Sequence, residues 1–146
     1  MQASLTLLVG APGSGKSTHG AAMERDGYIV LSSDAMRAVL GSGEDDQSVS
    51  AAVFRVMETM AAYFLSRGQR VVIDALNYRR RSRKTFIDIA WRYNAKVRAI
   101  HFLAGREVCL SRNAQRPRVV PESVIERVFE NFEAPDFNEV DELFLI

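Results

Sequence analysis

The chain has 146 residues and a net charge of +1, and 47% of its residues are hydrophobic while 25% are charged. These values are typical of one globular domain, which can bury roughly 70% of its extended surface, and they argue against a disordered or low-complexity chain. The one cysteine, Cys109, excludes an internal disulfide, and the apolar run at 5–9 is too short to span a membrane, so we expect a cytoplasmic protein without membrane contacts.

Apolar runs alternate with segments of helical periodicity along the whole chain. We expect strands at residues 5–9, 28–31, 71–73, 97–103 and 143–146, and helices at 16–25, 34–40, 47–67, 79–93, 107–113 and from 121 onward, with Ser33 as the N-cap of the second helix. This alternation predicts an α/β fold in which a five-stranded, mainly parallel sheet carries helices on both faces. Ligands of such sheets bind at the carboxyl ends of the strands.

The first strand and helix flank an unbroken phosphate-binding motif of the G-x-x-x-x-G-K-S type. Backbone N–H groups of such a loop surround polyphosphate oxygens, Lys16 reaches the β- and γ-phosphates, and the Ser17 hydroxyl ligates Mg²⁺. The motif predicts a P-loop NTPase-type three-layer sandwich that binds a nucleoside triphosphate. The candidate nucleotide-binding residues are Gly10, Ala11, Pro12, Gly13, Ser14, Gly15, Lys16, Ser17 and Thr18.

Asp34 and Arg37 follow the second predicted strand and lie three residues apart, on one helical face. The carboxylate can accept a proton from an attacking hydroxyl, and the arginine can hold a phosphate of the acceptor. Alternatively, Asp34 stabilises the start of its own helix and forms a surface salt bridge. Beside a phosphate-binding loop, we favour the functional interpretation.

Asp74 ends the third apolar run, as the acidic residue of a Walker-B-like element does. It is expected to hold a Mg²⁺-bound water or to orient Ser17, and the alternative is a cap for the next helix. We expect Ser17 to bind the metal directly, and Asp34 and Asp74 to act through water.

Two arginines, Arg112 and Arg116, precede a segment interrupted by proline. Arginines at this spacing can close over a triphosphate and neutralise the charge of the transferred phosphoryl group, which contributes about 10³–10⁵ in rate where such residues act. Alternatively, they are cations at a helix C-terminus, where the helix dipole favours them. We expect a lid near residues 106–121.

Positive charge is concentrated in the middle of the chain, because residues 67–118 hold 14 Lys and Arg against 3 Asp and Glu. Part of it is a cluster at the start of a predicted helix, where cations oppose the dipole. The cluster, Arg79, Arg80, Arg81, Arg83 and Lys84, is equally consistent with phosphate binding and with a solvated basic face.

Taken in chain order, these motifs resemble the kinase domain of the 5′-hydroxyl polynucleotide kinases, and above all the kinase module of bacterial RNA-repair polynucleotide kinase-phosphatases. The resemblance covers nearly the whole chain. It rests on residues 10–18, on Ser32-Ser33-Asp34 with Arg37, on Asp74-Ala75-Leu76-Asn77, and on Arg112-Asn113 with Arg116. One difference is Leu76, where the family often has threonine.

The resemblance implies a single P-loop kinase domain over residues 1–146 that uses ATP and Mg²⁺ to phosphorylate 5′-OH ends of RNA or DNA in nucleic-acid repair. In that scheme Asp34 is the general base, Arg37 binds the acceptor, and Arg112 and Arg116 are lid arginines that act with Lys16 in catalysis. The expected acceptor-binding residues are Asp34, Arg37, Asn77, Arg79, Arg80 and Arg81. The resemblance favours neither RNA nor DNA, and neither a monomer nor a homo-oligomer.

Two other functions share part of this pattern. Zeta-type toxins and chloramphenicol phosphotransferases also have the phosphate loop and an Asp-x-x-Arg pair, so a P-loop kinase of a sugar, an antibiotic or a nucleotide-sugar is the first alternative. An ATP-binding interaction module without phosphotransfer is the second, although Asp34 would then have no task. The position of the basic cluster relative to Asp34 discriminates between the polynucleotide and small-molecule acceptors.

Overall fold

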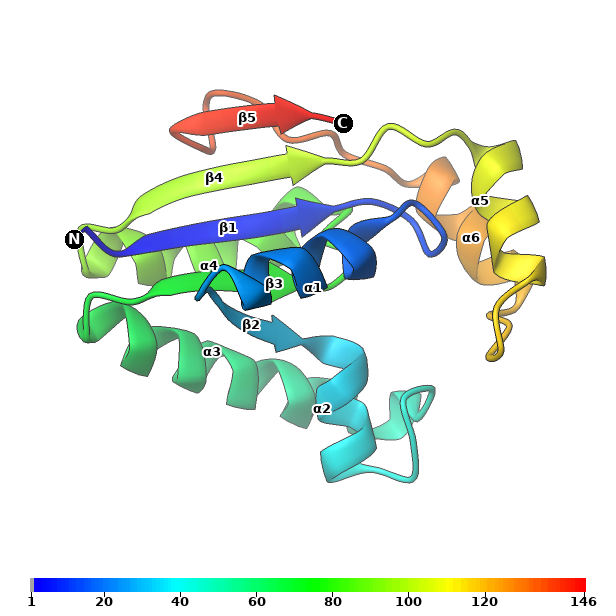
Figure 1. Ribbon diagram of the computed structural model, residues 1–146, viewed down its shortest axis with the longest axis horizontal. Helices are drawn as coiled ribbons and strands as arrows, with labels where there is room; N and C mark the ends of the chain where they lie inside the picture. The colour runs from blue at the N-terminus through cyan, green and yellow to red at the C-terminus, as the bar shows by residue number, and fades with distance from the viewer. Residues whose placement is uncertain (1) are drawn as a thin grey trace.

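The apolar runs of the chain pair into one parallel sheet. The structure is a computed structural model that describes residues 2–146. The strands are β1 Ser4–Val9, β2 Ile29–Ser32, β3 Arg70–Asp74, β4 Lys96–His101 and β5 Glu142–Leu145, in the order β2-β3-β1-β4-β5 (Figure 1). All four strand pairs are parallel, and β1, in the middle, is buried along its whole length.

Helices cover both faces of this sheet, as predicted. Buried residues of α3 Ser50–Ser66 and α4 Arg80–Arg92 pack in one core with Leu5, Leu7 and Ile73 of the sheet. On the opposite face, Met23 of α1 Lys16–Arg25 packs with Leu8. The predicted α/β three-layer architecture is therefore confirmed.

The remaining helices lie at or beyond the carboxyl ends of the strands (Figure 1). They are α2 Ser33–Leu40, a short 3₁₀ helix at Gln47–Val49, α5 Arg106–Ala114 and α6 Glu122–Glu130. None of the helices formed by residues 2–146 is long and apolar enough to cross a membrane.

Strand register brings three functional segments to one edge of the sheet. Asp74 at the end of β3 lies opposite Leu8 of β1 on one side and Ser32 of β2 on the other. The phosphate loop, the start of α2 and the turn after β3 therefore begin next to one another.

Two local predictions are wrong. Ser32, rather than Ser33, caps α2: its hydroxyl accepts a hydrogen bond from the Ala35 N–H at 3.2 Å, because Ser32 is still extended while Ser33 is already helical. The helix predicted at 47–67 is divided, since the 3₁₀ turn at Gln47–Val49 precedes α3.

Candidate active site

The phosphate loop wraps the N-terminus of α1 and is supported from the side of α5. Gly13 and Gly15 have φ values of 85° and 103°, which glycine adopts without strain. A Cβ at Gly13 would lie only 2.7 Å from the carbonyl oxygen of Cys109 in α5. Close packing against α5 is thus a second reason for glycine at this position.

Lys16 is buried at the base of the loop, where its Nζ donates a hydrogen bond to the Ala11 carbonyl at 3.2 Å. Burial lowers the pKa of Lys16, although the carboxylates of Asp74 and Asp34 oppose that shift. An anion bound in the loop would stabilise the charged form of Lys16 and so oppose the effect of burial on its pKa.

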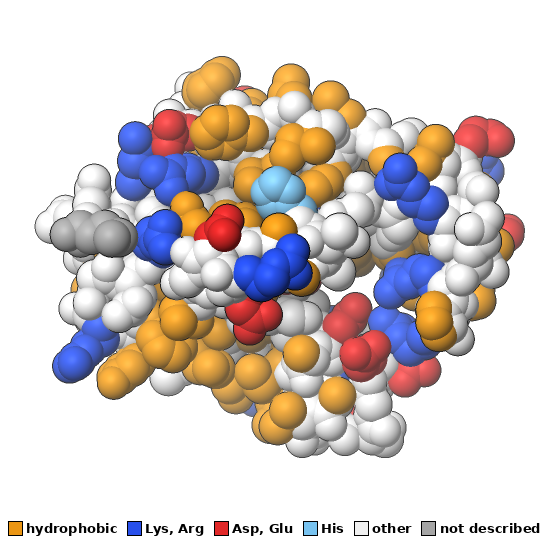
Figure 2. Space-filling model, viewed as in Figure 1, with side chains coloured by type: hydrophobic (Ala, Val, Ile, Leu, Met, Phe, Trp, Pro, Cys, Tyr) orange, Lys and Arg blue, Asp and Glu red, His pale blue; other side chains and the backbone are white. Residues whose placement is uncertain are grey.

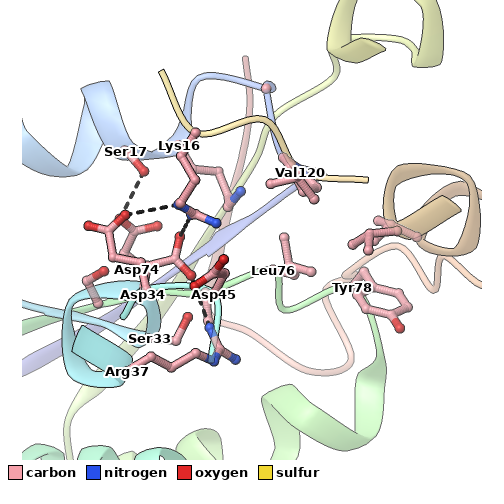
Figure 3. Close-up of a pocket in the computed structure, with 18 of the residues that line it drawn as sticks. Lys16, Ser17, Ser33, Asp34, Arg37, Asp45, Asp74, Leu76, Tyr78 and Val120 are labelled. Carbon is pink, nitrogen blue, oxygen red and sulfur yellow. Dashed lines mark hydrogen bonds and ion pairs between the residues drawn. The ribbon is translucent and has the colours of Figure 1, made fainter. Parts of the chain in front are cut away.

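Asp74 lies across from Lys16, and the Ser17 hydroxyl donates to its Oδ2 at 3.4 Å (Figure 3). Burial raises the pKa of Asp74, and the attraction of Lys16 only partly offsets this effect. A half-buried carboxylate beside a hydroxyl is an all-oxygen donor set, which Mg²⁺ prefers. The residues present therefore fit the predicted metal.

Asp34 extends from the first turn of α2 into the same cavity, which has a volume of about 850 Å³. Its Oδ1 accepts from Arg37 at 3.0 Å, within α2, and its Oδ2 accepts from Arg118 at 3.3 Å. The Arg37 side chain is largely buried and also approaches the Ser50 hydroxyl at 3.4 Å. Both oxygens of the predicted base are thus held by arginines.

The segment predicted as a lid, residues 106–121, faces the phosphate loop. Arg112 donates to the Gly13 carbonyl at 3.3 Å, and Arg112 and Arg116 both line the cavity. Figure 2 shows the cavity opening as a hollow, with basic side chains on the rim formed by this segment and acidic side chains next to them on the lower rim. The two predicted lid arginines therefore share one cavity with Lys16 and Asp34.

One wall of the cavity, beside the phosphate loop, is mostly apolar. Leu76, Tyr78 and Val120 line it (Figure 3), together with Val119, Val124 and Val128. Leu76 contributes a methyl surface where the related family often has a hydroxyl.

Asn77 borders the cavity, but its side chain is engaged in holding the sheet together. The residue has a positive φ of 53°, and its Nδ2 donates to the carbonyls of Leu8 at 2.8 Å and Ile73 at 3.3 Å. The amide thereby ties the ends of β1 and β3. The geometry gives Asn77 a structural task, and its contact with the acceptor stays a prediction.

The basic cluster at the start of α4 is not part of the cavity lining. Arg80 pairs with Asp136 at 2.9 Å, and Arg79 lies over the Tyr78 ring at 5.5 Å. Arg83 is fully buried, where it forms a two-pronged ion pair with Glu139. The prediction that Arg79, Arg80 and Arg81 bind the acceptor therefore stays a prediction, and such contacts would lie outside this cavity.

Arg118 is a charged cavity residue that the sequence predictions did not name. It pairs with Asp34 and, through Nε, with Glu44 at 3.2 Å. A sequence signal was present, because Arg118 follows Arg116 and Pro117 in the predicted lid. The long-range pairing with α2 was not visible in the local pattern.

Comparison with known proteins agrees with this geometry. The chain matches the family described as AAA domain over residues 5–135. It is 25% identical over 140 residues to the L-seryl-tRNA(Sec) kinase of Methanococcus maripaludis, which covers 90% of this chain and 53% of that protein. A chain in the structure of the Pnkp1/Rnl/Hen1 RNA repair complex matches with a TM-score of 0.76 and 26% identity, over 89% of this chain and 43% of that one.

A gluconokinase from Sinorhizobium meliloti 1021 also matches, with a TM-score of 0.67 and 18% identity, over 98% of this chain and 81% of that one. This likeness shows the fold alone. The chain spans about half the length of the seryl-tRNA kinase and less than half of the repair-complex chain. Because the family match extends over most of the sequence, the chain belongs to the AAA domain family, with the fold and phosphate-binding loop of the P-loop kinases.

Proposed function

We propose that residues 1–146 form one kinase domain that transfers the γ-phosphoryl group of ATP to the 5′-hydroxyl end of RNA or DNA, in nucleic-acid repair. The observation that carries the proposal is the position of Asp34. It lies in the same cavity as the phosphate loop and is held on both oxygens by Arg37 and Arg118. A nucleotide-binding module without an acceptor has no need of such a carboxylate.

The phosphate loop and the arginines of the lid segment bind and orient the triphosphate. Lys16 and the loop N–H groups hold the β- and γ-phosphates, and Arg112 and Arg116 approach from the lid segment. Ser17, Asp74 and Asp34 would hold Mg²⁺, which would supply positive charge to neutralise the triphosphate. Because Lys16 is buried, its electrostatic effect is larger than in water.

Asp34 and Arg37 deprotonate and position the acceptor hydroxyl. As the hydroxyl oxygen bonds to the γ-phosphorus, the bond from that phosphorus to the β,γ-bridging oxygen breaks, ADP leaves, and the hydroxyl proton passes to Asp34. Arg37 lies beside Asp34 to bind an acceptor phosphate. The apolar wall of Tyr78 and Val120 offers a surface against which a nucleoside can pack.

Two similar proteins support an acceptor that is part of an RNA. The names of the repair complex and of the seryl-tRNA kinase both refer to RNA, at 26% and 25% identity. A small-molecule alcohol is the second candidate acceptor. The specific observation in its favour is that Arg79, Arg80 and Arg81 lie outside the cavity lining, which removes one argument for a polyanion.

The test is label transfer from γ-labelled ATP with Mg²⁺. The acceptors are 5′-OH RNA and DNA strands, the same strands with a 5′-phosphate, and a panel of sugars that includes gluconate. Label on the 5′-OH strands alone supports the proposal, and label on a panel member alone supports the second candidate.

A pair of variants assigns the base. Asp34→Asn should reduce transfer by about 10²–10⁴ while nucleotide affinity changes little. Asp88→Asn removes a carboxylate that pairs with Lys84 on the outside of α4, and it should leave transfer unchanged. If Asp34→Asn loses nucleotide affinity instead of turnover, Asp34 is not the base.

A further inference from the structure

Asp34 is held by residues from two distant parts of the chain. Arg37, one helical turn away in α2, donates to Oδ1, and Arg118, 84 residues away in sequence, donates to Oδ2. Arg37 moves with α2, whereas Arg118 belongs to the lid segment. The orientation of the carboxylate therefore depends on where the lid segment lies.

Arg118 also contacts a second carboxylate across the mouth of the cavity. Its Nε donates to Glu44 at 3.2 Å, in the loop that follows α2. Asp46 orders that loop, since it accepts hydrogen bonds from the N–H groups of Ser42 at 2.9 Å and Ser48 at 3.0 Å. The Ser48 hydroxyl also donates to Asp46, and this bond, together with the two from the N–H groups, lowers the pKa of Asp46 to about 2. Arg118 thus connects the lid segment to an ordered loop as well as to Asp34.

A short turn, closed by side-chain hydrogen bonds, connects Arg118 to Arg112 and Arg116, which face the phosphate loop. The Asn113 side chain is buried and exchanges two hydrogen bonds with Val120, Nδ2 to the carbonyl at 2.7 Å and the N–H to Oδ1 at 3.0 Å. The turn closed by this pair carries Arg116 and Arg118, and Arg112 immediately precedes it. A movement of Arg112 and Arg116 is therefore expected to move Arg118 as well.

We propose that Arg118 is a positioning residue that couples nucleotide binding to the orientation of Asp34. A triphosphate attracts Arg112 and Arg116 toward the loop, which favours the arrangement in which Arg118 contacts Asp34 and Glu44. A ligand shifts such an equilibrium by its differential affinity for the two arrangements, and the coupling is reciprocal. The role of Asp34 rests on the proposed function, whereas the coupling requires nucleotide binding alone.

Kinetics of the full chain test the positioning role. Arg118→Ala should reduce turnover about tenfold or more, because a misplaced base lowers the reaction rate steeply. Through the reciprocal coupling, it should weaken nucleotide affinity by no more than about threefold. Arg118→Lys retains one cationic contact and should restore part of the turnover. A loss confined to nucleotide affinity, or no recovery with lysine, would overturn the proposal.

Two further variants separate this role from general destabilisation of the lid segment. Arg106→Ala breaks an ion pair with Glu126 that joins α5 to α6 outside the cavity, and it should leave turnover unchanged. Glu44→Gln should reduce turnover less than Arg118→Ala, and should add nothing in the Arg118→Ala background, because the two residues act as a unit. Equal losses in Arg106→Ala and Arg118→Ala, or additive losses with Glu44→Gln, would contradict the coupling.

Hydrogen exchange tests the coupling without any acceptor. Addition of a non-hydrolysable ATP analogue to the wild type should protect amides of both the phosphate loop and residues 41–46. In Arg118→Ala the phosphate loop should still gain protection while residues 41–46 should not. Protection of residues 41–46 in both proteins would refute the coupling. Failure of the wild type to label any 5′-OH strand would instead refute the proposed function and leave this result intact.

Discussion

Alanine at Gly13 tests whether the phosphate loop depends on close packing against α5. Gly13 and Gly15 both have positive φ, and an L-residue there is destabilised by roughly 1–2 kcal/mol. A Cβ at Gly15 would have no neighbour closer than 3.9 Å, whereas a Cβ at Gly13 would lie 2.7 Å from the Cys109 carbonyl oxygen. That oxygen belongs to helix backbone and cannot rotate away, and overpacking of this kind adds about 1–3 kcal/mol.

We therefore expect Gly15→Ala to lower the free energy of unfolding by about 1–2 kcal/mol and Gly13→Ala by about 2–5 kcal/mol. Both substitutions stiffen the unfolded chain equally, so this effect cancels in the comparison. The assay is urea unfolding without nucleotide, with the slope m unchanged in both variants. Equal losses at the two positions would refute the contact between the loop and α5.

Three further predictions concern the charged groups. Burial raises the pKa of Asp74, so the charged form of this side chain destabilises the fold at pH 7. Asp74→Asn should therefore raise the melting temperature at pH 7, and this gain should disappear near pH 3, where Asp74 is protonated in both the folded and the unfolded chain. A lower melting temperature at pH 7 would contradict this reasoning. Glu139→Gln leaves Arg83 buried without its counter-charge and should lower the free energy of unfolding by about 3–5 kcal/mol in urea, and a loss under 1 kcal/mol would show that water reaches the pair. Arg112→Ala should weaken ATP-analogue binding about tenfold or more in calorimetric titration, since charge-assisted hydrogen bonds contribute about 1.5–3 kcal/mol, and unchanged affinity would exclude Arg112 from the donor site.

The strands and the phosphate loop were predictable because their signals are local. The run Leu5–Val9 is apolar because both faces of the central strand are covered, and the loop spacing follows from the shape of a polyphosphate. The AAA domain match supports the fold that these signals predicted. The strand order was not predicted, since parallel pairing depends on contacts between residues far apart in the chain.

The basic cluster shows where local pattern was insufficient. From sequence, Arg83 was equally consistent with phosphate binding and with a solvated basic face, yet within the cluster it is the side chain that the fold buries completely, against Glu139. A helical signal was available, because Arg83 shares the face of Phe86, Ile87 and Ala90. The acidic partner could not be identified from sequence, since it lies 56 residues away.

Cys109 also makes the movement of the lid segment measurable without any engineered label. It is the one cysteine in the chain, its side chain is fully buried, and burial raises the pKa of its thiol. The thiol packs between Ala11 of the phosphate loop and Ile125 and Val128 of α6, so a thiol reagent can modify the protein only when α5 separates from these neighbours, and the labelling rate reports how often that separation occurs. Slower labelling with bound nucleotide would measure, in the native sequence, how strongly the ligand holds α5 in place.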